Sequence, residues 1–373
     1  MPWGAATWME IMPELGYGIY NGAGTPWYPT LFGGNAFTMR KVPQRQVIRT
    51  ADGGNRRKFV VSNRKVFAGT LNTLLHPDQC AQWVTALSVN GTIPATGTVT
   101  LAGTTVGSVA INGGGSGYPT SSTIPVSFIG GGGSGAYGTA TASGGIVTSV
   151  AITAAGTGYT SIPGVQIGGM PSYSLMFWDG IQSWRFLGAC VASATITGNP
   201  NTDYTTLSLN WIAQQRDATF TTFAAPAETV YSTVLPYQYI ETAGNITVGA
   251  AHVPLSMYRM ASVTLTNQLK PTWDESQYIT SLMYAGRDLD FAVGPQMYTN
   301  TWRAAFEAQT PLQWVINFTR SSPSHSLTIT CETNTYLSNV TDDIPLDGPA
   351  YQALAAEVFY DASQTNDFVL AAT

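Results

Sequence analysis

Alternating apolar and polar positions along much of the chain predict a mainly β protein. Between residues 204 and 213, Leu207, Leu209 and Trp211 fall on one face of an extended strand, and hydroxyl and amide side chains fall on the other. Residues 326–331 alternate in the same way. Strands with one apolar and one polar face are typical of antiparallel sheets that cover a core on one side.

Two short helices interrupt this pattern. Pro77 suits the first turn of a helix over residues 76–87, and apolar residues recur there at intervals of three and four. A second helix is predicted over residues 300–308, where Thr299 or Asn300 can cap the first turn. The apolar stripes consist of Cys80, Trp83, Val84 and Leu87 in the first helix and of Trp302, Ala305 and Phe306 in the second.

Each helix lies between two predicted strands, so the chain contains the same β–helix–β unit twice. Residues 67–71 precede the first helix, and a polar–apolar strand follows it. Residues 289–293 precede the second helix, and residues 312–318 follow it. A tandem duplication of this kind favours assembly over catalysis.

The length of 373 residues allows two domains. Aromatic residues are abundant near the start, where we expect an arm with little regular structure. Further along, a turn at 52–54 predicts a hairpin over 46–65. The predicted division is an N-terminal arm, 1–34; a first domain, 35–90 with 171–217; an inserted module, 91–170; a linker, 218–230; and a second domain, 231–373.

The predicted insertion has an unusual composition. No Asp, Glu, Lys, Arg or His occurs from Gln79 to Trp178, and residues 91–170 hold 21 of the 39 glycines. A smaller repeat occurs twice, with a period of about 41 residues. Each copy contains a strand, a Gly-x-Gly-Tyr turn and a second strand, and the turn ends at Tyr118 in the first copy and at Tyr159 in the second. A disordered linker is the alternative interpretation, but the regular Val and Ile alternation favours a β module.

The charge distribution is asymmetric. Charged residues are only 10% of the chain and aromatic residues 11%, which favours extensive burial between subunits. Nine of the 16 basic residues lie at positions 40–65, and residues 342–373 carry six acids without a basic residue. Opposite charges at two places can steer one subunit onto the next. The candidate ring-stacking residues are Arg45, Arg49, Arg56, Arg57 and Lys58 on the basic side, and Asp342, Asp343 and Asp347 on the acidic side.

Other interpretations of these charges remain open. The basic cluster can also be a solvated loop, and the acidic cluster a solvated tail. A nucleic-acid groove would need aromatic residues interleaved with the basic ones for base stacking, and the basic stretch lacks them.

Little in the sequence indicates catalytic chemistry. The three histidines, His76, His252 and His325, have no second ligand at metal-binding spacing, so we expect no metal, no cofactor and no enzyme. Three distant cysteines predict buried free thiols, and paired acids such as Asp288 and Asp290 are interpreted as solvated loop residues. Gly130, Gly132 and Gly135 match G-x-G-x-x-G, but no helix follows and no acid occurs before Asp179, so we reject a dinucleotide site.

We expect neither a secretory signal nor a transmembrane helix. The first basic residue is Arg40, no apolar segment precedes it, and polar or helix-breaking residues interrupt every uncharged stretch.

Three segments resemble the tail tube proteins of long, flexible-tailed bacteriophages. Residues 171–180 (PSYSLMFWDG) resemble that family's P-S-Y strand, residues 186–200 its G-(A/C)-x-V stretch, and residues 204–213 its long alternating strand. Residues 262–269 and 326–331 resemble landmarks of its second tube domain. The resemblance covers roughly 35–90 and 170–365 and is diffuse. The insertion departs from the plain pattern, and its Gly-Ser-Gly-Tyr repeat resembles modules inserted in phage virion proteins.

The resemblance implies a β-sandwich with a flanking helix in each of two domains. It also implies that inner strands of neighbouring domains join into a barrel, that three chains form a pseudo-sixfold ring, and that stacked rings conduct DNA without binding it specifically. The implied partners are further copies of the chain, the tape measure protein, the tail terminator and distal tail proteins, with no membrane. The implied location is the phage tail, after assembly in the host cytoplasm.

Two other functions remain open. One is another virion part, such as a tail terminator or a decoration protein. The other is a surface adhesin, in which Tyr118, Tyr137 and Tyr159 stack on sugar rings. Tyrosines that pack inside turns are the plainer interpretation of the same residues.

Overall fold

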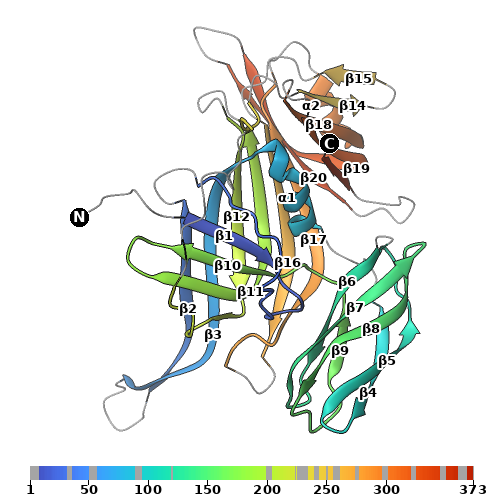
Figure 1. Ribbon diagram of the computed structural model, residues 1–373. Coiled ribbons are helices and arrows are strands. Elements are labelled where there is room, and N and C mark those ends of the chain that lie inside the picture. Colours follow the sequence, from blue (N-terminus) through green and yellow to red (C-terminus); the bar gives the residue numbers. More distant parts are fainter. Residues whose placement is uncertain are drawn as a thin grey trace.

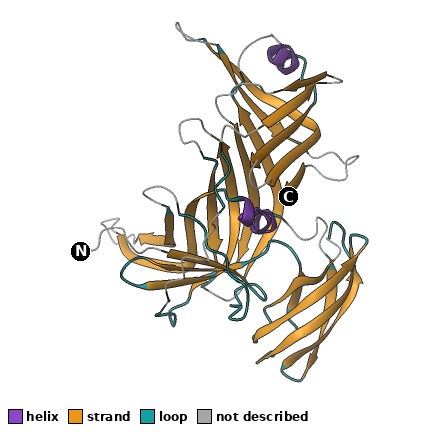
Figure 2. Ribbon diagram, turned by 45° about the horizontal axis from the view of Figure 1, so that its top comes forward, coloured by secondary structure: helices purple, strands orange, loops and turns teal. Residues whose placement is uncertain are grey.

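The protein is described from a computed structural model (Figure 1). The structure describes residues 8–31, 36–49, 57–88, 95–118, 121–198, 204–222, 224, 234–238, 243–248, 251–254, 261–273, 277–295, 301–320, 325–344, 350–359 and 368–372. Strands dominate and two short helices accompany them (Figure 2), so the mainly β prediction is confirmed.

Most strands belong to one antiparallel sheet. Its main path runs β15-β14-β18-β19-β20-β17-β16-β11-β12-β3-β2, and β1, β10, β13 and β21 branch from it. The bounds are β1 (Trp8–Pro13), β2 (Phe37–Arg49), β3 (Arg57–Leu74), β10 (Tyr173–Trp178), β11 (Ser183–Gly198), β12 (Thr206–Ala213), β13 (Gln215–Arg216), β14 (Ala243–Val248), β15 (Ala251–Pro254), β16 (Ala261–Thr272), β17 (Ser281–Val293), β18 (Leu312–Arg320), β19 (His325–Asp343), β20 (Tyr351–Val358) and β21 (Phe368–Ala372).

The helices lie where the apolar stripes predict them. A 3-10 turn η1 (Pro77–Gln79) leads into α1 (Cys80–Leu87), and α2 is Thr301–Glu307. Trp83 and Trp302 bury their side chains in one continuous core that extends through both halves of the sheet. Each helix therefore covers one face of the sheet, as Figure 1 shows for α1.

The strand periodicity also places the core as predicted. Leu207, Leu209 and Trp211 are buried on one face of β12, and the residues between them are not. The predicted hairpin over 46–65 is part of a longer one, because β2 and β3 pair from Phe37 with Leu71 to Arg49 with Arg57.

The prediction of an N-terminal arm with little regular structure is wrong for its first described part. Residues Trp8–Pro13 form β1, which pairs antiparallel with β10 along its whole length. Met9 and Ile11 are fully buried there. This strand was missed because its short alternation is surrounded by glycines, prolines and aromatic residues that favour irregular structure.

The glycine-rich segment folds into two small sheets packed on each other. One pairs β4 (Thr96–Ala102) with β5 (Thr105–Gly113). The other has the order β8-β7-β6-β9, with β6 at Ser121–Ile129, β7 at Ser134–Ser143, β8 at Ile146–Thr157 and β9 at Gly164–Ile167. Gly135 lies within β7, which continues to Ser143, so the G-x-G-x-x-G stretch does not open a helix.

The two copies of the small repeat hold each other through their tyrosines. Tyr118 donates its backbone N–H to Gly145 in the hairpin turn of the second copy, at 3.1 Å, and Tyr159 donates to Thr104 in the turn of the first copy, at 3.0 Å. The Tyr118 hydroxyl accepts from the Ala95 amide at 2.7 Å. The Tyr159 hydroxyl binds the backbone of Ala136, which lies 41 residues after Ala95.

This exchange explains the period of the repeat and corrects one hypothesis. Tyr118 and Tyr159 are 4% and 2% exposed, so neither can stack on a sugar. Both glycines of each turn have positive φ, which glycine adopts without strain and which turns each tyrosine inward. These glycines are Gly115, Gly117, Gly156 and Gly158.

We expect Tyr118→Phe to destabilise the glycine-rich segment by roughly 1–3 kcal/mol, because it leaves the buried Ala95 amide without its acceptor. The same hydroxyl also donates to the Ile167 carbonyl at 3.0 Å. Hydrogen exchange of the β6 and β9 amides would measure the loss. The matched control is Tyr137→Phe at a half-buried position, and equal protection in both variants would contradict the prediction.

Candidate assembly surfaces

The strand pairing repeats itself in the two halves of the chain. In the first half β2 pairs β3, β3 pairs β12, β12 pairs β11 and β11 pairs β10. In the second half β16 pairs β17, β17 pairs β20, β20 pairs β19 and β19 pairs β18, which is the same order. The predicted duplication is therefore present in the topology, and it includes more strands than the sequence pattern indicated.

Irregularities of the pairing also coincide. The β11–β12 register shifts between Val191 and Ser193, and the β19–β20 register shifts between Leu337 and Asn339. A bulge leaves one extra residue on the bulged strand and bends it. In each half this strand pairs first with one neighbour, β10 or β18, and further along with another, β12 or β20, so β11 and β19 occupy equivalent positions. We call the run β20-β17-β16-β11-β12-β3-β2 the inner sheet.

Among the described strands, one strand pairing joins the two halves. Residues 193–198 of β11 pair antiparallel with residues 261–266 of β16. Ala194 lies opposite Leu265 and Ile196 opposite Val263, and all four side chains are buried. Beside the junction Asn267 donates to the Val191 carbonyl at 3.0 Å, and the Arg287 guanidinium donates to the carbonyl at the end of α1 at 2.5 Å.

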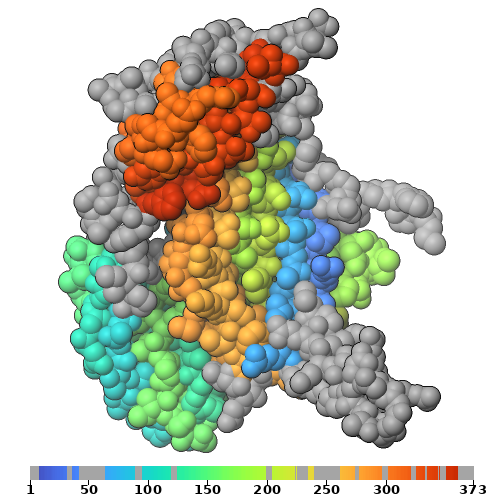
Figure 3. Space-filling model, turned by 180° about the vertical axis from the view of Figure 1, so that it is seen from behind, coloured from blue at the N-terminus to red at the C-terminus, as the bar shows by residue number. Residues whose placement is uncertain are grey.

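The opposite face of this inner sheet is polar. Helices cover the first face, whereas the strands β3, β12, β11, β16 and β17 lie side by side on the other face in Figure 3. Hydroxyl and amide side chains bond across successive strands there. The pairs are Thr38 with Thr70 (2.8 Å), Ser208 with Asn72 (2.7 Å), Asn210 with Ser193 (2.7 Å) and Thr195 with Thr264 (3.2 Å). We call this surface the open face.

Three carboxylates lie together on the open face. Asp288 and Asp290 alternate with buried Leu289 on β17, and Glu357 lies opposite Asp290 on β20. Partial burial, the Glu357 carboxylate and the Asp288 carboxylate raise the pKa of Asp290. The interpretation of Asp288 and Asp290 as loop acids is therefore wrong, because both belong to a strand and share one negative patch.

The predicted basic stacking residues lie along one hairpin. Arg45 and Arg49 belong to β2, and Arg57 and Lys58 belong to β3. The β2–β3 hairpin extends towards the bottom of Figure 1. Arg56 lies outside the described residues.

Two further basic residues at the base of this hairpin are engaged within the chain. The Arg64 guanidinium lies 4.5 Å from the ring centre of Trp273, and the Lys65 ammonium lies 4.6 Å from that of Tyr278. Cation–π contacts of this kind hold the β2–β3 hairpin beside the β16–β17 hairpin. The basic stretch is thus partly bound within the chain, and only its outer part remains for the predicted stacking role.

The predicted acidic residues lie at the end of β19. Asp342 pairs with Arg303 of α2 and accepts from Gln352 at 2.9 Å. Asp343 is the last residue of β19, and Asp347 lies outside the described residues. No contact within the described part of the chain brings the acidic and basic clusters together, so their role in stacking stays a prediction.

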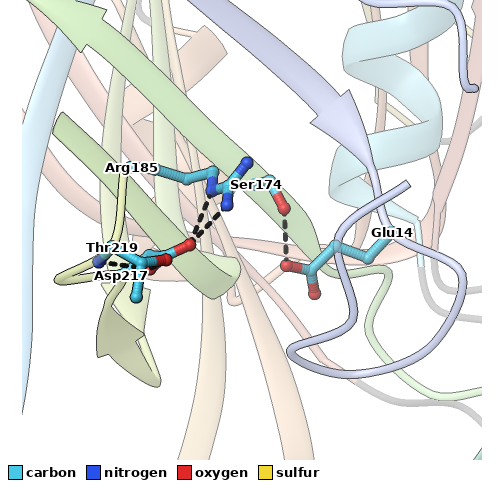
Figure 4. Close-up of polar contacts among 5 residues, drawn as sticks. All are labelled: Glu14, Ser174, Arg185, Asp217 and Thr219. Carbon is cyan, nitrogen blue, oxygen red and sulfur yellow. Dashed lines mark hydrogen bonds and ion pairs between the residues drawn. The ribbon is translucent and has the colours of Figure 1, made fainter. Parts of the chain in front are cut away.

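A buried carboxylate anchors the N-terminal segment to the first half. Glu14 accepts from the Gly18 amide (2.8 Å), the Gly188 amide (2.8 Å) and the Ser174 hydroxyl (2.9 Å), as Figure 4 shows for Ser174. Burial raises the pKa of Glu14, and these donors oppose the rise. Sequence reasoning missed this residue because its partners come from distant segments.

A second polar cluster lies near this anchor. Arg185 binds Asp217, as Figure 4 shows. The Arg185 guanidinium also lies 4.2 Å from the ring centre of Tyr20, so the N-terminal segment is held here too. Burial opposes ionisation of Asp217, but hydrogen bonds from Thr219 and Arg185 outweigh it and lower the pKa of Asp217 to about 2. Both clusters are structural, since each carboxylate is engaged by neighbouring donors.

A cavity of about 520 Å³ separates the N-terminal segment from the glycine-rich segment. Its lining includes Glu14, Tyr17 and Cys190, and also Ser127 and Gln166 of the glycine-rich segment. The Tyr17 amide donates to the Ser127 hydroxyl at 2.9 Å, which ties the glycine-rich segment to the helix-covered side of the sheet. Burial raises the pKa of the Cys190 thiol, which disfavours the nucleophilic thiolate.

The prediction of buried free thiols is confirmed. Cys80, Cys190 and Cys331 are free and buried. Among the described residues, no group of three or more His, Cys, Asp or Glu is arranged to hold a metal ion. In the same part of the chain, no helix is long and apolar enough to cross a membrane.

Comparison with known proteins identifies one family. A family model described as phage tail tube protein matches residues 130–358, which is more than half of the chain. No curated protein matches the sequence.

We expect the stabilising effect of Glu14, relative to a Glu14→Gln variant, to fall as the pH rises. The folded-state pKa of Glu14 lies above its ordinary value of 4.5, so the folded chain keeps a proton that the unfolded chain releases. The contribution is complete below that value and is lost as the pH rises through the folded-state pKa. Urea unfolding of both proteins between pH 4 and pH 8 would measure the difference, and a difference that grows with pH would contradict it.

Proposed function

Because the chain belongs to the phage tail tube protein family, we propose that its copies close into rings that stack into the tube conducting DNA to the host. The protein is a structural component of the phage tail. In this proposal it assembles in the host cytoplasm and acts in the virion.

The observation that supports this proposal most strongly is the two-sided inner sheet. One face packs on the core, and the open face carries paired hydroxyls and amides together with Asp288, Asp290 and Glu357. A wall around moving DNA needs a surface that does not hold phosphates, and a hydroxyl-rich face with carboxylates meets that need. We therefore assign the open face to the lumen.

The internal duplication supports a ring of three chains. Each chain would contribute two equivalent tube domains, residues 35–90 with 171–217 and residues 231–373, so three copies would supply six. The module at 91–170 would project outside, in agreement with its attachment through Ser127 to the helix-covered side. Edge strands that pair around a ring are no longer exposed to aggregation.

Stacking would use the charged ends of the chain. Arg45, Arg49, Arg56, Arg57 and Lys58 would meet Asp342, Asp343 and Asp347 of a neighbouring ring, a head-to-tail contact that continues without closing. The tape measure protein, the tail terminator and distal tail proteins would bind the inside and the two ends of the tube. An adhesin is disfavoured, since Tyr118 and Tyr159 are buried.

We expect the purified chain to form long hollow tubes with a regular axial repeat in negative-stain electron microscopy. Averaged end views should show three identical units, each with two similar lobes. Isolated rings that never stack would favour a tail terminator, and a chain that stays monomeric at high concentration and low salt would overturn the proposal.

We expect Asp290→Lys to make assembled tubes retain DNA. The substitution replaces a like-charged neighbour of Glu357 and Asp288 by a cation on the open face, so the affinity of the tube for DNA should rise about tenfold at low salt. Fluorescence anisotropy with short duplexes would measure it. Glu307→Lys, on the exposed side of α2, is the control with the same charge change, and equal retention by both variants would contradict the lumen assignment.

A further inference from the structure

The β11–β16 pairing joins two strand edges inside the chain. The equivalent edges, on β19 and β2, have no partner strand within the described structure. On the inner sheet β11 of the first half holds β16 of the second half. β19, the equivalent of β11, has no partner beyond β20 along residues 339–343 among the described strands. β2, the equivalent of β16, is the last strand on the sheet path and pairs only with β3 in the described structure.

The coinciding bulges fix which residues are equivalent. Val191 and Leu337 are the last paired residues before each bulge, and they lie opposite Trp211 and Ala356. Ser193 therefore corresponds to Asn339. Counting along each strand, Thr195 corresponds to Thr341, Ile196 to Asp342 and Thr197 to Asp343.

The same count extends across the sheet to the outer edge. If Trp211 corresponds to Ala356, then Leu209 corresponds to Leu354. Leu209 lies opposite Leu71 and Leu354 lies opposite Val293, so Leu71 corresponds to Val293. Phe37 lies opposite Leu71 and Ala261 lies opposite Val293, so Phe37 corresponds to Ala261. Thr264 then corresponds to Arg40, and Leu265 to Lys41.

We propose that residues 339–343 of β19 pair antiparallel with residues 38–42 of β2 in a second copy, in the register of the junction inside the chain. Thr195 lies opposite Thr264 inside the chain, so Thr341 lies opposite Arg40 between copies. By the same rule Val340 lies opposite Lys41, and Asn339 opposite Val42. The proposal rests on the proposed ring and specifies which edges close it.

We call this proposed pairing of β2 with β19 of another copy the seam. The charges at the seam distinguish it from the junction inside the chain. In the proposed register Arg40 is diagonal to Asp343, and Lys41 is diagonal to Asp342. Diagonal cross-strand neighbours are roughly 7–8 Å apart, within reach of long side chains. The corresponding residues inside the chain, Thr264 with Thr197 and Leu265 with Ile196, are uncharged.

This difference prevents the two junctions from exchanging partners. Pairing β2 with β11 of another copy would place Lys41 beside the apolar Ala194 and Ile196, and pairing β19 with β16 would place Asp342 beside Val263 and Leu265. A cation without a partner in an apolar contact is unfavourable, so the first wrong pairing is disfavoured. In the second, the Asp342 carboxylate keeps its bonds to Arg303 and Gln352 but loses the diagonal Lys41 of the correct pairing. In this arrangement Asp342 and Asp343 serve closure within a ring in place of stacking. Asp347 and the outer basic residues remain for stacking.

A disulfide test fixes the register. The full chain with Val42→Cys and Asn339→Cys, a pair that retains every charge, should on oxidation of assembled tubes form covalent multimers on a non-reducing gel. Ser193→Cys with Thr266→Cys, the equivalent pair inside the chain, should cross-link without forming multimers. Val42→Cys with Val340→Cys is out of the proposed register by one residue and should form none. The native cysteines do not interfere, because all three are buried and burial raises the pKa of the Cys80 thiol to about 12.

A charge exchange tests the recognition. Arg40→Glu or Asp343→Lys alone should raise the concentration needed for assembly roughly tenfold, and the two together should restore it. Lys270→Glu, an exposed position on β16 outside the junction, has the same charge change as Arg40→Glu and should assemble normally.

The outcomes separate this inference from the proposed function. If the unmodified chain forms no ring or tube, the proposed function fails and the seam fails with it. If tubes form but the Val42→Cys, Asn339→Cys chain yields no multimers, or yields no more than the Val340→Cys control, the seam is wrong and the tube function stands. Failure of the double charge exchange to restore assembly would overturn the charge recognition.

Discussion

The backbone hydrogen bonding between β11 and β16 is the interaction on which the rest of the structure depends. It joins two similar halves into one inner sheet, and the core that packs on this sheet is continuous from one half to the other. Asn267 and Arg287 reinforce the junction from the second half by donating to backbone carbonyls of the first. Because strand edges without partners are exposed to unwanted pairing, the position of this junction also decides which edges remain for other copies.

Local patterns predicted the elements well and their long-range pairing poorly. The helix over 76–87, the helix over 300–308 and the two faces of β12 follow from periodicities of 3.6 and 2 residues, which depend only on near neighbours. The pairing of Thr195 with Thr264 depends on residues far apart in the sequence, and no local pattern encodes it. The strand β1 was missed for a related reason, since its burial depends on β10.

The candidate surfaces divide in the same way. The unequal charge distribution is visible in the sequence, so the basic and acidic clusters could be named. Their distance from each other along the sheet, and the engagement of Asp342 by Arg303, could not be inferred from composition. The carboxylate patch was misread because Asp288 and Asp290 meet Glu357 only after β17 pairs with β20. The buried Glu14 was not seen at all, since its donors lie in segments remote from it.

The covalent link between the two halves has a kinetic consequence. A linked second domain experiences the first at a high effective concentration, so the junction at β11 and β16 forms at any dilution and with first-order kinetics. Only the remaining edges depend on protein concentration. In the proposed ring, encoding both halves in one chain reduces the bimolecular encounters from five, for six separate domains, to two, for three chains. It also allows the two halves to diverge, so that only one of them carries a glycine-rich appendage.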